Sequence, residues 1–231
     1  MSDSHLEILA HEMTPLGPLC LRRRELLCEP GTIVTEVTLN HEFLMSSLYT
    51  DSERALARTA MQMHAGSDLR VLVGGLGLGY TAWEALLSER VAGVEVVELL
   101  PQVIDWLKND LVPLSCELRD ERRLAITPGD VFRRLRGPGD DLFDVILIDV
   151  DHSPDEHLDE ENVSFYTAPG LQGARRHLAA DGILAVWSYA ESTPFADALR
   201  AVFEQVHVKP ISHYNHLIDQ DCTDWLFFAR G

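Results

Sequence analysis

The hydrophobic pattern of the chain changes near residue 50. Residues 5–48 contain short stretches in which apolar and polar positions alternate, separated by turns that contain proline and glycine. These stretches begin near Glu7, Pro18 and Thr32. Alternation between such turns predicts a small antiparallel sheet, and we assign residues 1–49 to this N-terminal β-region.

Beyond this region, helical and strand-like patterns alternate. A helix is expected from Asp51, with Thr50 or Asp51 as its N-cap. The strands expected after it are Arg70–Val73, Gly93–Glu98, Leu124–Thr127, Phe143–Asp149 and Ile183–Ser188. The helices expected between and after them are Thr81–Ser88, Pro101–Leu107, Asp130–Leu135, Pro169–Ala180 and Thr193–Val202.

Two further strands, which begin near Phe203 and Asp224, follow one another without a helix and predict a final antiparallel hairpin. The run Val145–Ile148 is continuously apolar, as in parallel strands buried on both faces. Alternating β and α units of this length predict an α/β fold with a doubly wound sheet of seven strands over residues 50–231.

Composition narrows the function classes. The 231 residues include 46% hydrophobic residues, which is enough for a folded core, and no apolar run is long enough to cross a membrane. The net charge of −18 disfavours a nucleic-acid partner and would attract a cationic substrate, although it is also consistent with solubility alone. No signal peptide is evident and the four cysteines are scattered, which favours a cytoplasmic protein.

A glycine-rich loop follows the first parallel strand. Gly75, Gly77 and Gly79 lie between that strand and a helix, the context in which glycine loops bind nucleotides. Glu98 lies at the tip of the second strand, where a carboxylate can accept hydrogen bonds from ribose hydroxyls, and Leu99 beside it is expected in the same pocket.

The spacing G-x-G-x-G differs from the dinucleotide fingerprint and resembles the class I S-adenosylmethionine-dependent methyltransferase fold. The turn Gly129-Asp130-Val131 after the third strand resembles the adenine-binding turn of that superfamily. The resemblance implies that Asp130 accepts a hydrogen bond from the adenine amino group while Val131 packs beside the ring. Asp130 is equally suited to be a helix N-cap.

The segment FDVILIDVDHSP (Phe143–Pro154), together with the N-terminal β-region, FYTAPGL and AADGIL, resembles the polyamine aminopropyltransferases, the spermidine synthase family. The resemblance implies transfer of an aminopropyl group from decarboxylated S-adenosylmethionine to a small-molecule amine, in a homodimer. It implies that Asp149 is the base that deprotonates the attacking ammonium. Asp151, His152 and Trp187 are expected to bind the substrate, although core packing explains Trp187 equally well.

Three departures separate the chain from that family. The Asp-Ser-Ser-Asp of the family is replaced by Asp149-Val150-Asp151-His152, and the aspartate of its glycine loop is replaced by Leu76 or Leu78. The Tyr-His pair expected after Asp51-Ser52-Glu53 is absent. A methyltransferase that uses S-adenosylmethionine itself, and a non-catalytic adenosyl-binding protein, therefore remain alternatives.

Three other clusters have simpler interpretations. The acidic segment Asp149–Glu161 is expected to be a solvated loop rather than a metal site, because no second ligand follows the fifth strand. The histidines of His207–His216 are expected at the surface, although such a hairpin could also cover a substrate. Arg22-Arg23-Arg24 is expected to form ion pairs within the chain or between subunits.

Overall fold

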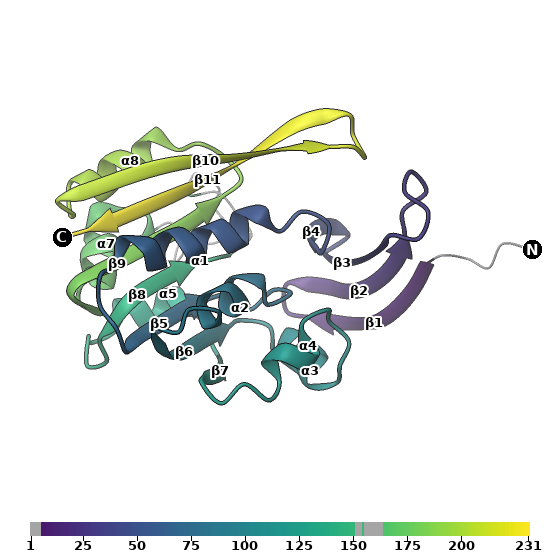
Figure 1. The fold of residues 1–231 in the computed structure, drawn as a ribbon, viewed down its shortest axis with the longest axis horizontal. Coiled ribbons are helices and arrows are strands. Elements are labelled where there is room, and N and C mark those ends of the chain that lie inside the picture. The colour runs from purple at the N-terminus through teal and green to yellow at the C-terminus, as the bar shows by residue number, and fades with distance from the viewer. Residues whose placement is uncertain (1–5, 151–153, 155–163) are drawn as a thin grey trace, which may run out of the picture.

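The computed structural model describes residues 6–150, 154 and 164–231 (Figure 1). Within these residues the chain forms a four-stranded sheet near the N-terminus and a seven-stranded sheet that makes up the centre of the molecule. No helix in these ranges is both long and apolar enough to span a membrane.

The seven-stranded sheet has the order β10-β11-β9-β8-β5-β6-β7. Its strands are β5 (Leu69–Gly74), β6 (Val91–Glu98), β7 (Leu124–Pro128), β8 (Phe143–Ile148), β9 (Leu178–Ser188), β10 (Gln205–Asn215) and β11 (Gln220–Arg230). The pairs among β5 to β9 are parallel, whereas β11 pairs antiparallel with β9 and with β10. The predicted doubly wound α/β fold with a final antiparallel hairpin is therefore confirmed.

Helices cover both faces of this sheet (Figure 1). They are α1 (Asp51–Met63), α2 (Tyr80–Leu86), α3 (Pro101–Lys108), α4 (Ser115–Leu118), α5 (Val131–Arg136), α7 (Ala168–Arg175) and α8 (Thr193–Arg200). Val71 and Val145 pack in one core cluster with residues of α1 to α4, whereas Leu72 and Ile146 pack in the other with residues of α5, α7 and α8. Neighbouring residues of one strand thus face opposite layers, which explains the continuous apolar runs.

The N-terminal sheet is an antiparallel meander of β1 (Leu6–Thr14), β2 (Gly17–Glu25), β3 (Ile33–Leu39) and β4 (Glu42–Ser46). Leu19, Leu21 and Val37 are at most 1% exposed and belong to the same core cluster as α1 to α4. One face of this sheet therefore packs directly on the rest of the chain, which is how so small a sheet is stabilised.

The ion pairs expected for the basic run lie within the chain. Arg22 and Arg24 both bind the carboxylate of Glu36, with N–O distances of 2.8 and 2.7 Å, and Glu36 is only 3% exposed. These hydrogen bonds and charges hold the pKa of Glu36 below its ordinary value, although burial acts in the opposite direction and is the largest single effect.

The structure differs from the prediction in one helix boundary and in one additional strand. The helix predicted over Pro169–Ala180 ends at Arg175, because Leu178 already pairs with Phe143 in the sheet. Asp181 has a φ of +63° and lies near a register shift in this pairing, so the strand enters the sheet through an irregularity that hydrophobic periodicity does not reveal. The sequence pattern does not indicate strand β4, since its turn is made by Asn40 and His41 at positive φ rather than by glycine or proline.

The final hairpin is longer than the sheet that carries it. β10 and β11 pair from Gln205 with Arg230 to Asn215 with Gln220, but β11 pairs with β9 only over Trp225–Arg230. Residues 211–224, which we call the ribbon, therefore extend beyond the sheet as a two-stranded arm (Figure 1, yellow).

Candidate active site

The glycine loop lies at the point where the strand order reverses, between β5 and β8, which is where doubly wound sheets bind ligands. Gly75 and Gly79 have φ values of +95° and +93°, a region that favours glycine. A Cβ atom on Gly75 would overlap the carbonyl oxygen of Asp149. Glycine at this position therefore lets the ends of β5 and β8 approach each other closely.

Glu98 connects the second strand to this loop. Its carboxylate accepts hydrogen bonds from the backbone N–H of Leu76 at 2.7 Å and from that of Leu100 at 2.8 Å. The side chain is 7% exposed, and burial raises the pKa of Glu98 while the backbone hydrogen bonds lower it in part. Glu98 thus holds the glycine loop in place and also lines the cavity beside it.

The turn after β7 contributes Asp130, and its side chain has the N-cap function that the sequence left open. Its Oδ1 atom accepts hydrogen bonds from the backbone N–H groups of Phe132 at 2.8 Å and Arg133 at 3.3 Å. The carboxylate also lines the cavity, so the cap leaves its second oxygen as an acceptor for a ligand. Val131 packs against Gly74, where a Cβ atom would overlap its side chain.

A cavity of about 720 Å³ runs along the carboxyl ends of the parallel strands. One end, over β6 and β7, is lined by the glycine loop with Glu98, Leu99, Gly129, Asp130 and Val131. The other end, over β8, β9 and β11, is lined by Asp149, Trp187 and Asp224, with Ser52 and Glu53 from α1. The candidate adenosyl-binding residues and Asp149 therefore share one cavity.

The lining of this cavity is rich in acidic side chains. Its described lining residues include neither lysine nor arginine but six acidic side chains, namely Glu36, Glu53, Glu98, Asp130, Asp149 and Asp224. Of these, Glu36 is paired with Arg22 and Arg24 from outside the lining, and the raised pKa of Glu53 favours its neutral form. Residues 151–163, most of which lie outside the described ranges, contain no lysine or arginine in their sequence either. The cavity therefore suits a ligand that carries positive charge.

Asp149 follows β8 directly and is fixed by Thr81 of α2. The hydroxyl of Thr81 donates to Oδ2 of Asp149, and the N–H of Asp149 donates to the carbonyl of Gly74 at 2.8 Å. Removal from bulk water, with a contribution from the charge of Asp224, raises the pKa of Asp149 to about 6. Asp149 is then mostly ionised at neutral pH, yet it is a stronger base than an ordinary aspartate.

Two more carboxylates face Asp149. Glu53 lies in the first turn of α1, and burial together with the charge of Asp149 raises its pKa to about 8. Asp224 lies on β11, and its pKa is also raised, mainly by burial. Ser52 Oγ donates to Glu53 Oε2 at 3.0 Å, and Trp187 Nε1 donates to Ser52 Oγ at 3.1 Å.

The ribbon covers this end of the cavity. His213, Asn215 and Leu217 are among its lining residues. The ring of His213 stacks on Tyr49, with centroids 4.4 Å apart, and the N–H of His216 donates to the hydroxyl of Tyr49 at 3.1 Å. The ribbon is thereby attached to the segment between β4 and α1, and His213 lies at the cavity instead of at the open surface, where the sequence analysis placed it.

The structure brings together most of the predicted site residues. Gly75, Gly77, Gly79, Glu98, Leu99, Gly129, Asp130, Val131, Asp149 and Trp187 all line the cavity. Trp187 also packs against the core, so the two interpretations of this residue are compatible. Asp151 and His152 lie outside the described residues, as does most of the acidic segment that follows Asp149.

Sequence reasoning missed Glu53 and Asp224 as members of the site. Glu53 resembles an ordinary acidic residue in the first turn of a helix. Asp224 gave a weak signal, because aspartate is unfavourable in a strand and here precedes the apolar run Trp225–Phe228. Thr81 and Tyr49 carried no local signal.

The strand order, the glycine loop and the carboxylates after β6 and β7 define a class: this is the doubly wound fold of the class I S-adenosylmethionine-dependent methyltransferases. No protein-family model matches the chain. The chain is 33% identical over 134 residues to polyamine aminopropyltransferase 2 of Streptomyces coelicolor, a match that covers 57% of this chain and 23% of that protein.

A second relative and two solved structures have names from the same group of enzymes. Polyamine aminopropyltransferase of Prochlorococcus marinus subsp. pastoris is 28% identical over 157 residues, which cover 68% of this chain and 50% of that protein. Spermidine synthase from Thermotoga maritima superposes with a TM-score of 0.76 at 18% identity, covering 96% of this chain and 72% of that structure. A spermidine synthase in complex with the transition state analogue AdoDATO gives the same TM-score at 19% identity, covering 96% of this chain and 73% of that structure.

The matches thus span about a quarter to a half of the length of these curated relatives. They confirm the resemblance indicated by the motifs: the chain is similar in sequence to polyamine aminopropyltransferases and in fold to spermidine synthases.

Proposed function

We propose that the chain is an aminopropyltransferase that moves the aminopropyl group of decarboxylated S-adenosylmethionine to a small amine. The single observation that carries this proposal is the cavity, which joins an end lined by the candidate adenosyl-binding residues to an end lined by Asp149, Glu53 and Asp224 and has no lysine or arginine in its described lining. A sulfonium donor and an ammonium acceptor both carry the positive charge that this lining complements.

The adenosyl end would hold the donor. Glu98 would accept hydrogen bonds from the ribose hydroxyls, with Leu99 beside the sugar, and the free oxygen of Asp130 would accept from the adenine amino group while Val131 packs on the ring. Gly75, Gly77 and Gly79 would let the backbone approach the ligand. All of these residues line the cavity, which supports the assignment.

Asp149 would act as the base. The acceptor enters as an ammonium and becomes nucleophilic when one proton passes to the Asp149 carboxylate. Its nitrogen then forms a bond to the aminopropyl carbon that is attached to sulfur, and the bond between that carbon and sulfur breaks. The sulfur keeps the electron pair and leaves as the thioether 5′-methylthioadenosine. Because the sulfonium already activates this carbon, the enzyme supplies mainly proximity and deprotonation.

The lining also favours the decarboxylated donor over S-adenosylmethionine. The carboxylate of S-adenosylmethionine would enter an anionic cavity without a lysine or arginine to pair with, either among the described lining residues or in the sequence of residues 151–163. Burying an unpaired charge of the same sign is unfavourable. The methyltransferase alternative needs this carboxylate to be accommodated, so donor preference separates the two functions.

We also propose that the enzyme is a cytoplasmic homodimer, that residues 1–49 form the β-region through which it assembles, and that residues 50–231 form the catalytic domain. Large apolar side chains on the N-terminal sheet remain exposed in the single chain, among them Ile8 at 63%, Met13 at 72% and Ile33 at 55%. Covering them would remove apolar surface from water, which supports assembly through this sheet.

Calorimetry with three ligands tests the donor assignment. Decarboxylated S-adenosylmethionine and methylthioadenosine should bind, whereas S-adenosylmethionine should bind at least tenfold more weakly. Glu121→Gln is a suitable control, because Glu121 interacts with Arg123 on the surface and does not line the cavity. Tighter binding of S-adenosylmethionine than of its decarboxylated form would contradict the proposal.

A further inference from the structure

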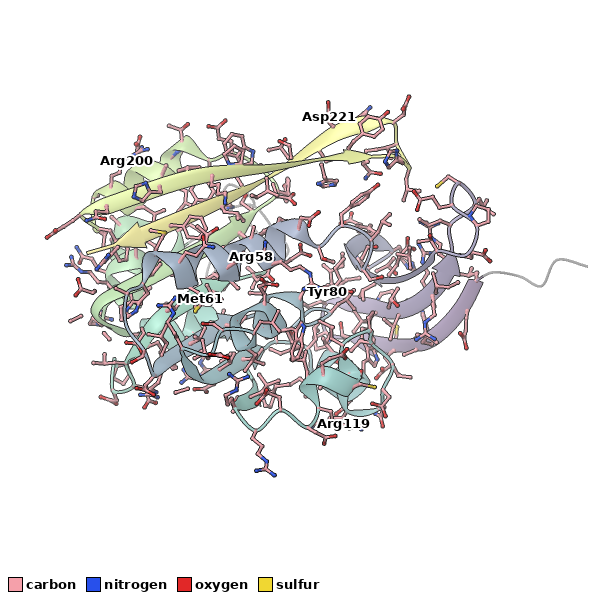
Figure 2. The ribbon with its side chains drawn as sticks, in the orientation of Figure 1. Arg58, Met61, Tyr80, Arg119, Arg200 and Asp221 are labelled. Atoms are coloured by element: carbon pink, nitrogen blue, oxygen red, sulfur yellow. The ribbon has the colours of Figure 1, made fainter. Side chains whose placement is uncertain are left out.

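One side of the cavity, formed by the N-terminal sheet and the glycine loop, is apolar. The large aliphatic side chains that line it there, which we call the apolar wall, are Leu39, Leu44, Met45, Leu48, Leu76 and Leu78. Leu76 and Leu78 are only 5% and 4% exposed, and the other four are half-buried. Tyr80, at the end of α2 nearest to the N-terminal sheet, adds an aromatic ring to the lining (Figure 2).

The two halves of the apolar wall are in contact. A Cβ atom placed on Gly77 of the glycine loop would lie 3.3 Å from Sδ of Met45, so β4 packs directly against the loop. The N-terminal sheet also contributes Glu36 to the lining, but its carboxylate is already paired with Arg22 and Arg24. Among the described lining residues of this side, none therefore offers an unpaired charge to a ligand.

The apolar glycine loop distinguishes this chain from the family that it resembles. Leu76 or Leu78 stands where that family has an aspartate. An ammonium group placed against the apolar wall would lose its hydration without gaining a partner, which is unfavourable. A hydrocarbon group placed there would be removed from water, which is favourable. The wall therefore selects the uncharged, apolar part of a ligand.

The apolar wall adjoins the reaction centre. Gly75, which precedes Leu76 in the glycine loop, packs against the backbone carbonyl of Asp149. On the N-terminal side, Leu48 is followed by Tyr49, which also lines the cavity and stacks on the ribbon at the end that contains Asp149. One molecule can therefore place an ammonium at Asp149 and a hydrocarbon group against the wall.

Apolar surface continues from the wall to the rim of the cavity. Three cavity-lining side chains remain largely exposed, namely Leu16 at 50%, Phe43 at 62% and Leu217 at 42%. They come from the β1–β2 turn, from β4 and from the tip of the ribbon. Exposed apolar surface at a cavity is typical of ligand-binding grooves. A hydrocarbon chain longer than the wall would therefore still contact apolar surface at the rim.

We propose that the acceptor is a primary amine with an apolar alkyl or arylalkyl substituent, whose ammonium binds at Asp149 while its hydrocarbon part binds the apolar wall. This inference rests on the proposed function and adds the acceptor class. The amine loses one proton to Asp149, its nitrogen bonds to the aminopropyl carbon, and the bond between that carbon and sulfur breaks. With an alkylamine, the products are an N-alkyl-1,3-diaminopropane and methylthioadenosine.

A series of acceptors tests the inference. From 1-aminobutane through 1-aminohexane to 1-aminooctane, kcat/KM should rise about two- to fourfold for each methylene that is buried against the wall. The value for 1-aminohexane should exceed that for 1,4-diaminobutane. Met45→Gln keeps the length of the side chain but makes it polar. In this variant, the ratio of kcat/KM between 1-aminooctane and 1-aminobutane should fall about 5- to 20-fold.

Met63→Gln is the matched control, since Met63 is a half-buried methionine at the end of α1 that does not line the cavity. It should keep the ratio of the wild type. A wild-type preference for 1,4-diaminobutane would overturn the inference, as would the same ratio in Met45→Gln as in Met63→Gln. A wild-type series that does not rise with chain length would assign the wall to the S-methyl group of the donor or to a second copy of the chain, and would also overturn it.

A binding measurement separates failure of this inference from failure of the proposed function. Calorimetry can follow the binding of 1-aminobutane and 1-aminooctane to the protein saturated with methylthioadenosine, whether or not any amine supports turnover. Tighter binding of the longer amine, by a ratio that Met45→Gln lowers at least fivefold, supports the inference even for an inactive protein. Equal binding of both amines, or no amine binding, overturns it.

Discussion

Replacing Glu98 by glutamine tests how the adenosyl end of the cavity is built. The substitution keeps the shape of the side chain, but one of two carboxylate oxygens becomes an NH₂ group. The carboxylate accepts from Leu76 at 2.7 Å and from Leu100 at 2.8 Å, so one of these backbone donors would then face another donor. We also expect it to accept from the ribose, and that interaction weakens with the charge.

The expected loss of affinity and of stability in Glu98→Gln follows from these hydrogen bonds. A hydrogen bond to a charged group contributes about 1.5–3 kcal/mol, so donor binding should weaken by about 2–3 kcal/mol, or roughly 30- to 150-fold in Kd. The buried N–H that loses its acceptor should also lower the free energy of unfolding by about 1–3 kcal/mol. In a chain of this size, each kcal/mol corresponds to roughly 2–4 °C in Tm.

Calorimetry with methylthioadenosine measures the first effect, and thermal unfolding without ligand measures the second. Glu95→Gln is the control: Glu95 lies on the same strand and pairs with Arg134, but does not line the cavity. It should leave Kd unchanged. If Glu98→Gln binds methylthioadenosine as tightly as the wild type, Glu98 does not hold the ribose. A lower Tm with unchanged Kd would restrict its role to the glycine loop.

Three further predictions concern catalysis, pH and assembly. Asp149→Asn removes the base but keeps the shape of the side chain, so turnover should fall about 10²- to 10⁴-fold. Methylthioadenosine binding, measured by calorimetry, should barely change. Turnover equal to that of the wild type would contradict the assignment of Asp149 as the base. Burial raises the pKa of Asp149 to about 6 and that of Glu53 to about 8, so the folded protein binds protons more readily than the unfolded chain. The stability linked to these protons is complete at low pH and is lost as the pH rises through these pKa values. The Tm without ligand should therefore fall between pH 5 and pH 9. In Glu53→Gln the Tm should fall less steeply over the same range. An identical slope would show that Glu53 does not carry this effect. Sedimentation should show a dimer at micromolar concentration that Ile8→Lys weakens, whereas a monomer at all concentrations would remove the proposed assembly.

The fold was predictable because its signals are local. The apolar run Val145–Ile148 and the glycine loop each show their surroundings within a few residues of sequence. The end of α7 was not predictable, since Leu178 is drawn into the sheet by Phe143, a residue far away in the chain. Tertiary pairing outweighed the helical pattern there.

The site also contains residues that could be predicted from the sequence and residues that could not. The residues after parallel strands, such as Glu98 and Asp149, could be placed from sequence because the carboxyl ends of those strands meet at one edge of the sheet. Glu53 and Asp224 come from α1 and from an antiparallel strand, and no spacing in the sequence connects them. Only folding brings them to Asp149, so they become visible as candidate site residues through the shared cavity and through the charges of Asp149 and Asp224, which raise the pKa of Glu53.

The most direct test of the account is an analysis of the nucleoside product. Purified protein is incubated separately with S-adenosylmethionine and with its decarboxylated form, in the presence and absence of 1,4-diaminobutane, and the thioether released is identified by chromatography and mass spectrometry. We predict methylthioadenosine, formed only from the decarboxylated donor, only with the amine, and about 10²- to 10⁴-fold more slowly in Asp149→Asn. Release of S-adenosylhomocysteine, or no thioether from either donor with any amine tested, would contradict the account.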